Sequence, residues 1–259
     1  MDYKHIIYEE REKIGTMTLN RPEKRNALGQ QAEEEMTHCF KEAGKKRTVR
    51  VIIIKGNGPV FCSGHDKAEI LNQPINNVRD FFQTCIDMYD LMHAIPQPII
   101  AQVHGIAMAG GCHLVAGCDL AVAAEKGAQF AMTGVKIGYN CSSPTVAVSR
   151  AIGQKKTLEM LFTGNFLSAQ EALTQGLVNR VVAPDALLET AYATARTIAE
   201  MGPLSVTAAK RAIFEGEDRE LEKANQREVD LFAGCFASAD QKEGMDAFLN
   251  KRKAEFQGN

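Results

Sequence analysis

The part of the sequence that most constrains the fold is residues 98–119, where a short apolar run leads into a glycine-rich turn. The run at 98–103 begins with a proline and predicts a buried strand. The turn after it contains Gly105, Gly110 and Gly111. Residues 112–116 have the composition of a helix start, and the first N–H groups of a helix have no partner within the helix. Such donors suit an anion or a carbonyl oxygen that gains charge, although glycines that merely permit tight packing explain the turn as well.

A second apolar run, residues 51–55, leads into another glycine-rich loop at 56–66. It too predicts a buried strand whose loop can point a backbone N–H outward. If the two loops each give one N–H to the same oxygen, they form an oxyanion hole.

Further apolar runs predict strands near the N-terminus and in the middle of the chain, at 5–9, 14–20 and 119–124. Helical patterns occupy 29–46 and 76–94, and from residue 144 onward helices predominate, with a capping box at Ser168 and Glu171. Strands that alternate with helices favour an α/β core.

Charge and hydropathy exclude several classes of protein. The net charge of −2 gives no electrostatic reason to expect binding to nucleic acid or to a membrane surface. No apolar run is long enough to span a membrane, and the first residues lack the pattern of a signal peptide. Seven cysteines without a small-scaffold spacing favour reduced thiols, so we expect a cytoplasmic protein.

Several motifs occur in a fixed order along nearly the whole chain. They are Leu19–Leu28 (LNRPEKRNAL), Phe61–Asp66 (FCSGHD), Gly105–Asp119, Phe162–Gly164, Ala169–Ala172, Gly176–Val178 and Glu243–Leu249. Together they resemble the crotonase superfamily, the enoyl-CoA hydratase/isomerase group. The Ser-Gly-His-Asp sequence at 63–66 resembles a subgroup that includes methylmalonyl-CoA decarboxylase-like and hydratase-domain-containing proteins.

The resemblance implies a fold, an assembly and a substrate class. The fold is a crotonase-like α/β spiral of ββα units over residues 1–200, which holds the acyl-CoA site, followed by a C-terminal helical trimerisation lobe over 201–259. Apolar side chains of the late helices exceed what a small lobe can bury, which favours a homotrimer or a dimer of trimers. The partner molecule is an acyl-CoA thioester, with no cofactor beyond the coenzyme A of the substrate.

The resemblance also assigns roles residue by residue. It places the two oxyanion N–H donors at Ser63 and Gly110. It places the other predicted residues around coenzyme A. Basic side chains meet the phosphates (Lys24 and Arg25), and backbone lines the pantetheine channel (Ala27 and Leu28). The first loop and the residues that follow it complete the set (Cys62, Gly64, Asp66 and Lys67).

The sequence departs from the hydratase pattern at both glutamates that activate water. Their positions are occupied here by His113 and Gly134. Acid–base work on water needs titratable groups near the reacting atoms, so we expect poor hydration of ordinary enoyl-CoA. His113, Thr133 and Asn140 are candidates for orienting a substrate carboxylate or delivering a proton. His65 could face the acyl pocket or lie on a surface loop, and no ligand spacing predicts a metal site.

Three functional hypotheses remain open at this point. The first is an enzyme that forms a thioester enolate without the two glutamates, as a decarboxylase, a thioester hydrolase or an isomerase. The second is an enoyl-CoA hydratase that uses other acid and base groups. The third is an acyl-CoA-binding protein that has lost the chemistry.

Overall fold

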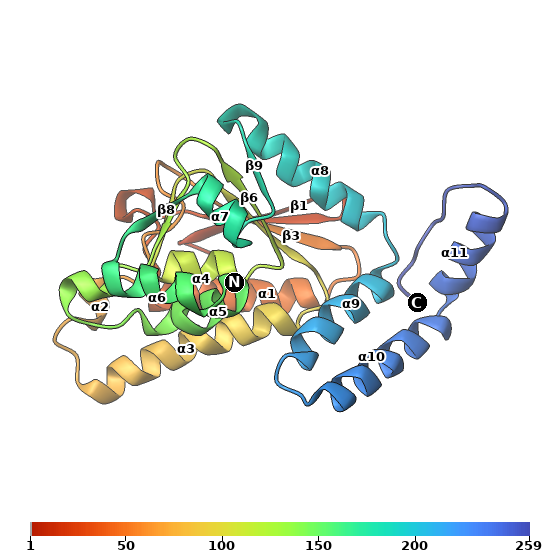
Figure 1. The fold of residues 1–259 in the computed structure, drawn as a ribbon. Coiled ribbons are helices and arrows are strands. Elements are labelled where there is room, and N and C mark those ends of the chain that lie inside the picture. Colours follow the sequence, from red (N-terminus) through yellow and green to blue (C-terminus); the bar gives the residue numbers. More distant parts are fainter. Residues whose placement is uncertain (1) are drawn as a thin grey trace.

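The computed structural model describes residues 2–259, and its core is a six-stranded sheet with helices on both faces (Figure 1). The strand order is β1-β2-β3-β4-β6-β9, with β1 and β2 antiparallel and the later neighbours parallel. The strands are β1 (Ile6–Arg11), β2 (Ile14–Leu19), β3 (Val51–Gly56), β4 (Ile99–Val103), β6 (Leu120–Ala124) and β9 (Arg180–Val182). The predicted α/β core is confirmed.

β3, β4 and β6 are buried on both faces over most of their length, which is why they are apolar runs. Successive residues of β3 point to opposite sides, so Ile52 and Ile54 belong to one core and Val51 and Ile53 to the other. The first core also includes side chains of α1 (Gln30–Gly44) and α3 (Ile75–Ala94), and the second is closed by α8 (Leu187–Ala199).

A second, smaller sheet follows the order β5-β7-β8 and was not predicted. Its strands are β5 (Ile106–Met108), β7 (Gln129–Ala131) and β8 (Phe166–Ser168). Each strand is three residues long, too short for an alternating pattern to stand out from the surrounding sequence.

The glycine-rich loops leave the same edge of the large sheet. β3 and β4 are parallel neighbours, so the loop after Gly56 and the segment after Val103 start side by side. The carboxyl edge of parallel strands is where α/β proteins bind ligands. The second segment passes through β5 and ends in α4 (Gly110–Ala116).

Helices predominate from residue 144 onward, as predicted, whereas the short helix α2 (Lys67–Ile70) was not predicted. The remaining helices are α5 (Ser142–Ile152), α6 (Gln154–Thr163), α7 (Ala169–Gln175), α9 (Pro203–Gly216), α10 (Leu221–Phe236) and α11 (Ala239–Leu249), with short 3-10 turns η1 (Pro22–Lys24), η2 (Gly134–Ile137) and η3 (Pro184–Ala186). The capping box of Ser168 and Glu171 is confirmed. None of the helices that the structure describes is long and apolar enough to cross a membrane.

The C-terminal helices reach away from the sheet, and α10 and α11 lie at the far end of the molecule (Figure 1). Lys210 anchors α9 to the core: its buried ammonium lies 2.9 Å from Asp119 and donates to the carbonyls of Met92 and Gln97. The predicted boundary after residue 200 falls in the connection between α8 and α9. The division into two domains stays a prediction.

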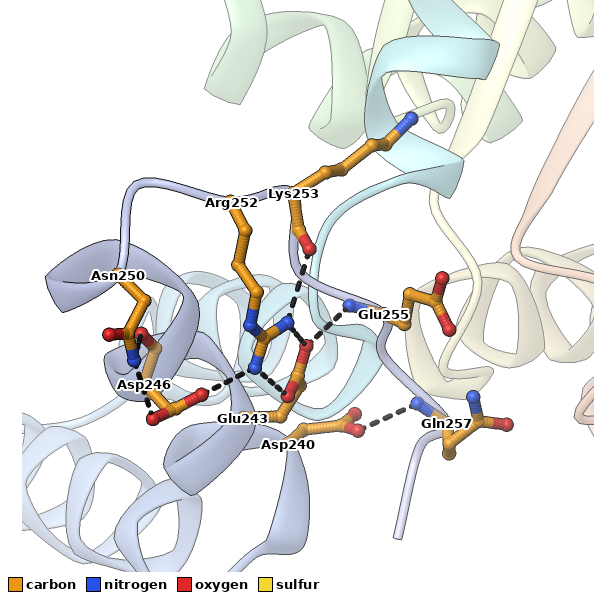
Figure 2. A network of polar contacts seen from close by, with 8 residues as sticks. All are labelled: Asp240, Glu243, Asp246, Asn250, Arg252, Lys253, Glu255 and Gln257. Atoms are coloured by element: carbon orange, nitrogen blue, oxygen red, sulfur yellow. Dashed lines mark hydrogen bonds and ion pairs between the residues drawn. The ribbon is translucent and has the colours of Figure 1, made fainter.

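The last residues of the chain fold back along α11 (Figure 2). Arg252 binds Glu243 through two hydrogen bonds and Asp246 through a third. The carboxylate of Asp240 accepts the backbone N–H groups of Gln257 and Gly258. The tail and α11 therefore form one unit.

Candidate functional site

The two glycine-rich loops are held together by backbone hydrogen bonds. Cys62 N–H donates to the Ile106 carbonyl at 3.1 Å, and Met108 N–H donates to the Cys62 carbonyl at 2.9 Å. Two glycines permit this approach. A Cβ at Gly111 would lie 2.2 Å from the Cys62 carbonyl oxygen, and one at Gly64, where φ is +89°, would lie 2.8 Å from that of Met108.

The first loop is also fixed by the turn at residues 21–28, through two side chains that the sequence analysis did not single out. The buried amide of Asn26 donates to three carbonyls of the loop, those of Asn57, Val60 and Phe61. Arg21 donates to the Ala27 carbonyl and forms an ion pair with Asp66 at 3.1 Å. No periodic pattern marks either residue, because both act on backbone brought together by the fold.

The two predicted N–H donors occupy different environments. Gly110 is the first residue of α4, directly after Ala109, which has a φ of +49°. Ser63 N–H donates to the Arg25 carbonyl at 3.1 Å in this structure. A substrate oxygen that binds there has to share this donor or replace the Arg25 carbonyl. The role of both donors stays a prediction.

The predicted coenzyme A residues differ in their exposure to solvent. The side chains of Lys24, Arg25 and Lys67 are exposed, whereas Leu28 is buried and exchanges backbone hydrogen bonds with Gly64 and Asp66. The Asp66 side chain caps α2 by accepting from Ala68 N–H. The charged groups of the turn are therefore free to meet an anion, while Leu28 could contribute backbone only.

His113 lies inside the protein. Its side chain is stacked on Tyr89 with the ring centroids 3.4 Å apart, and its Nδ1 lies 2.6 Å from Ser143 Oγ. Burial is the main reason that the pKa of His113 falls to about 3, and the nearby His65 and His93 add to the effect. The imidazole is therefore neutral near pH 7 and can exchange hydrogen bonds without carrying a charge.

The other predicted catalytic residues lie on the segment that follows β7. Thr133 is half-buried, and Asn140 is exposed. Gly134, where the resemblance implies a glutamate, has no room for a side chain: a Cβ would lie 2.7 Å from the Tyr139 carbonyl oxygen and 2.9 Å from Cys141 Sγ. Glycine is the residue that this turn accommodates.

His65 is not a surface residue. Its side chain is 8% exposed and packs edge-on against Phe81 and Phe82. The ring also packs closely on Gly110, because a Cβ added there would lie only 2.8 Å from the Cε1 atom of His65. His65 Nε2 lies 3.3 Å from Glu33 Oε1 and 3.1 Å from Cys85 Sγ. It therefore connects the second loop to the buried Glu33 of α1.

A continuous series of polar contacts runs from this point to His113. It consists of Glu33–His65 (3.3 Å), His65–Cys85 (3.1 Å), Cys85–Ser143 (3.5 Å) and Ser143–His113 (2.6 Å). Burial raises the pKa of the Glu33 carboxyl and of the Cys85 thiol, an effect that His65 partly offsets for Glu33 and Ser143 for Cys85. A sequence signal for Glu33 existed, because it lies on the same helical face as Met36 and Phe40, both buried.

Two pockets lie in different parts of the molecule. One of about 300 Å³ lies between α1, α2 and α3, and its lining includes Glu33 and Phe81. Another of about 280 Å³ lies near Pro98 and Val49, where β3 and β4 begin. The first pocket adjoins the residues described above, and the second is at the amino ends of the strands, remote from both loops.

Known proteins of one family are similar to this chain. A family model described as enoyl-CoA hydratase/isomerase matches residues 9–259. The chain is 38% identical to enoyl-CoA hydratase domain-containing protein 3, mitochondrial, of Rattus norvegicus over 241 residues, which cover 93% of this chain and 80% of the relative. It is 36% identical to crotonyl-CoA hydratase of Syntrophomonas wolfei over 258 residues, 99% of each chain.

Solved structures show the same fold. The crystal structure of human enoyl coenzyme A hydratase domain-containing protein 3 matches with a TM-score of 0.94 and 37% identity over 98% of this chain and 100% of that chain. Enoyl-CoA hydratase of Mycobacterium smegmatis also matches with a TM-score of 0.94, at 36% identity over 98% of this chain and 99% of that one. The crotonase-like fold is confirmed, and the chain belongs to the enoyl-CoA hydratase/isomerase family, in the crotonase superfamily.

Proposed function

We propose that the protein binds an acyl-CoA thioester with its carbonyl oxygen between the N–H groups of Ser63 and Gly110 and stabilises the enolate. The observation that supports this proposal is the close packing of the two loops, through the hydrogen bonds of Cys62 and the contact of Gly64 with the Gly110 backbone. Backbone donors fixed in this way lose little orientation when negative charge develops on the oxygen.

The absence of a charge at positions 113 and 134 favours loss of CO2 from a malonyl-type thioester. In that reaction the bond between the α-carbon and the carboxylate breaks, CO2 leaves, and the electron pair remains as the enolate, which then takes a proton at the α-carbon. No base has to remove a carbon-bound proton. A neutral imidazole at His113 and a glycine at 134 also avoid the repulsion that two glutamates would exert on the substrate carboxylate.

The test is a panel of malonyl-, methylmalonyl-, acetoacetyl- and crotonyl-CoA, with products followed by mass spectrometry. We expect decarboxylation of a malonyl-type ester and slow hydration of crotonyl-CoA, well below the roughly 10 per second typical of enzymes. Hydrolysis to free coenzyme A would instead assign a thioesterase. Binding of these esters without turnover would favour the non-catalytic binder.

Two substitutions at one position test the oxyanion assignment. Ser63→Pro removes the N–H donor, whereas Ser63→Ala removes only the hydroxyl and is the matched control. We expect turnover of the active ester to fall roughly 10²- to 10³-fold in the proline variant and to persist in the alanine variant. A folded proline variant with full turnover would contradict the assignment.

Hydration is the second candidate, because the Syntrophomonas wolfei relative is named a crotonyl-CoA hydratase. In this chain, hydration would have to use groups other than paired glutamates, and His113→Glu restores one of them. Gly134→Glu is a poor partner for it, because the clash with Tyr139 and Cys141 would disturb the turn. Rapid crotonyl-CoA hydration by the unaltered protein would establish this alternative.

We also propose that the chain assembles as a homotrimer or a dimer of trimers. α10 has no buried residue, and large apolar side chains on α10 and α11 are exposed. They are Leu221, Val229, Phe232, Phe236, Met245, Phe248 and Leu249. Exposed apolar surface of this extent is typical of a contact between subunits.

A further inference from the structure

Three side chains with metal-binding atoms converge from three separate elements beside the second loop. Glu33 comes from α1, His65 from the first loop and Cys85 from α3. One ligand atom of each lies within 4.8 Å of the other two. None of the three is among the residues that the proposed oxyanion chemistry uses.

The carboxylate of Glu33 has no adequate partner for its burial. Glu33 is 0% exposed, and neither of its oxygens accepts a hydrogen bond from the residues that the structure describes. His65 Nε2 is within ion-pair distance of Oε1, at 3.3 Å, but it is not aligned for a hydrogen bond. Burying a carboxylate without hydrogen bonds costs roughly several kcal/mol of folding free energy unless another charge compensates it. The cluster therefore holds a buried carboxyl group without a hydrogen-bond donor, at a place where a bound cation would compensate its charge.

The ligand atoms lie close to the spacing of a tetrahedral metal site. Zinc bonds of about 2.0 Å to oxygen, 2.0–2.1 Å to nitrogen and 2.3 Å to sulfur imply separations of about 3.3 Å between oxygen and nitrogen and about 3.6 Å between nitrogen and sulfur. The observed separations are 3.3 Å for Glu33 Oε1 to His65 Nε2 and 3.1 Å for His65 Nε2 to Cys85 Sγ. Of these two, the second has to open by about half an ångström, and the Glu33 and Cys85 ligand atoms lie within 4.8 Å of each other.

We propose that Glu33, His65 and Cys85 bind one Zn²⁺ ion, with water in the fourth position. A thiolate and an imidazole select zinc over magnesium or calcium, which prefer oxygen ligands. Three protein ligands with one open position form the pattern of accessible zinc sites. Glu33 also lines the pocket of about 300 Å³ between α1, α2 and α3, so this pocket borders one of the three ligands. Ser143 Oγ, 3.5 Å from Cys85 Sγ, supports the sulfur from outside.

The ion would join α1, the first loop and α3 through single bonds from each. Because the His65 ring packs against Gly110, a fixed His65 also fixes the start of α4. We therefore expect Zn²⁺ to raise the midpoint temperature of unfolding, since it binds the folded chain at a site that the unfolded chain lacks.

The test uses the full-length protein after removal of metals with a chelator. Co²⁺ serves as the probe, because a cysteine thiolate bound to Co²⁺ gives a near-ultraviolet charge-transfer band that histidine or carboxylate ligands alone do not give. We expect this band at one Co²⁺ per chain, its loss on addition of one Zn²⁺, and a higher unfolding temperature with Zn²⁺.

Variants locate the site. Cys85→Ser should abolish the band, and Glu33→Gln should weaken Zn²⁺ binding at least about 100-fold, more than loss of an outer support. Cys39→Ser is the matched control, because Cys39 is also buried but packs near Tyr3. It should keep both the band and the affinity. No thiolate band in the unaltered protein, or a band that survives Cys85→Ser, would overturn the proposal. If Cys85→Ser fails to fold, an unchanged Zn²⁺ affinity in Glu33→Gln would overturn the proposal.

Discussion

Replacing His113 by glutamine should flatten the dependence of stability on pH. In the folded protein burial lowers the pKa of His113 from 6.5 to about 3. At a pH between these two pKa values, the unfolded chain binds a proton at this residue and the folded chain does not. Falling pH therefore favours unfolding, and the stability associated with a neutral His113 is complete above pH 6.5 and is lost as the pH falls toward 3.

The size of the effect follows from the two pKa values. From pH 7 to pH 5 the unfolded histidine becomes almost fully protonated while the folded one stays neutral. Linkage then gives a loss of about 2 kcal/mol in the free energy of unfolding over this interval. The side chain is 4% exposed, so solvent screens the effect little. Glutamine does not titrate and can keep a hydrogen bond to Ser143.

The measurement is urea unfolding at several values between pH 5 and pH 7, followed by far-ultraviolet circular dichroism because the chain has no tryptophan. The variant can differ in stability at pH 7, and other groups can titrate in both proteins. The quantity to compare is the slope of unfolding free energy against pH in each protein. The difference between these two slopes isolates residue 113 if both proteins unfold in two states. Equal slopes for the two proteins would refute the reasoning that burial keeps His113 neutral.

Three other predictions concern packing and assembly. Lys210→Met leaves Asp119 without its buried cation and should lower the unfolding free energy, measured in urea, by about 3–5 kcal/mol. Lys242→Met, at an exposed position, should change it by less than about 0.5 kcal/mol, and similar losses in both variants would be inconsistent with a buried anchor. Asn26→Ala leaves three loop carbonyls without their donor and should lower the unfolding free energy by at least about 2 kcal/mol. It should also weaken the binding of coenzyme A esters in calorimetry, and unchanged affinity would argue against a role of Asn26 in the site. Sedimentation should give the mass of three or six chains, and Phe232→Glu combined with Phe248→Glu should lower it toward one chain; a single-chain mass for the unaltered protein at micromolar concentration would exclude the assembly.

The sequence predicted those features that repeat or that occupy a motif. The inner strands β3, β4 and β6 were visible as apolar runs because both of their faces are buried, and α3 was visible from its stripe of Cys85, Met88 and Met92. The meeting of the two glycine-rich loops also followed, since β3 and β4 end at one edge. The family resemblance added the ββα spiral, which periodicity alone does not give.

The rest depended on contacts between residues far apart in the chain. Asn26 meets loop carbonyls more than thirty residues away, and Glu33, His65 and Cys85 converge from separate elements. No local pattern encodes such a meeting. His113 was expected beside the substrate, but its stacking depends on Tyr89, which lies on another helix, and its neutral state depends on burial.

The distribution of the cysteines makes chemical labelling selective. All seven thiols are free, and Cys235 on α10 is the one that is not buried. A maleimide dye added to the native protein should therefore react at Cys235 well before the other six, without any substitution. The dye would sit on the helix whose apolar side chains are exposed, where its fluorescence can follow subunits as they associate and separate.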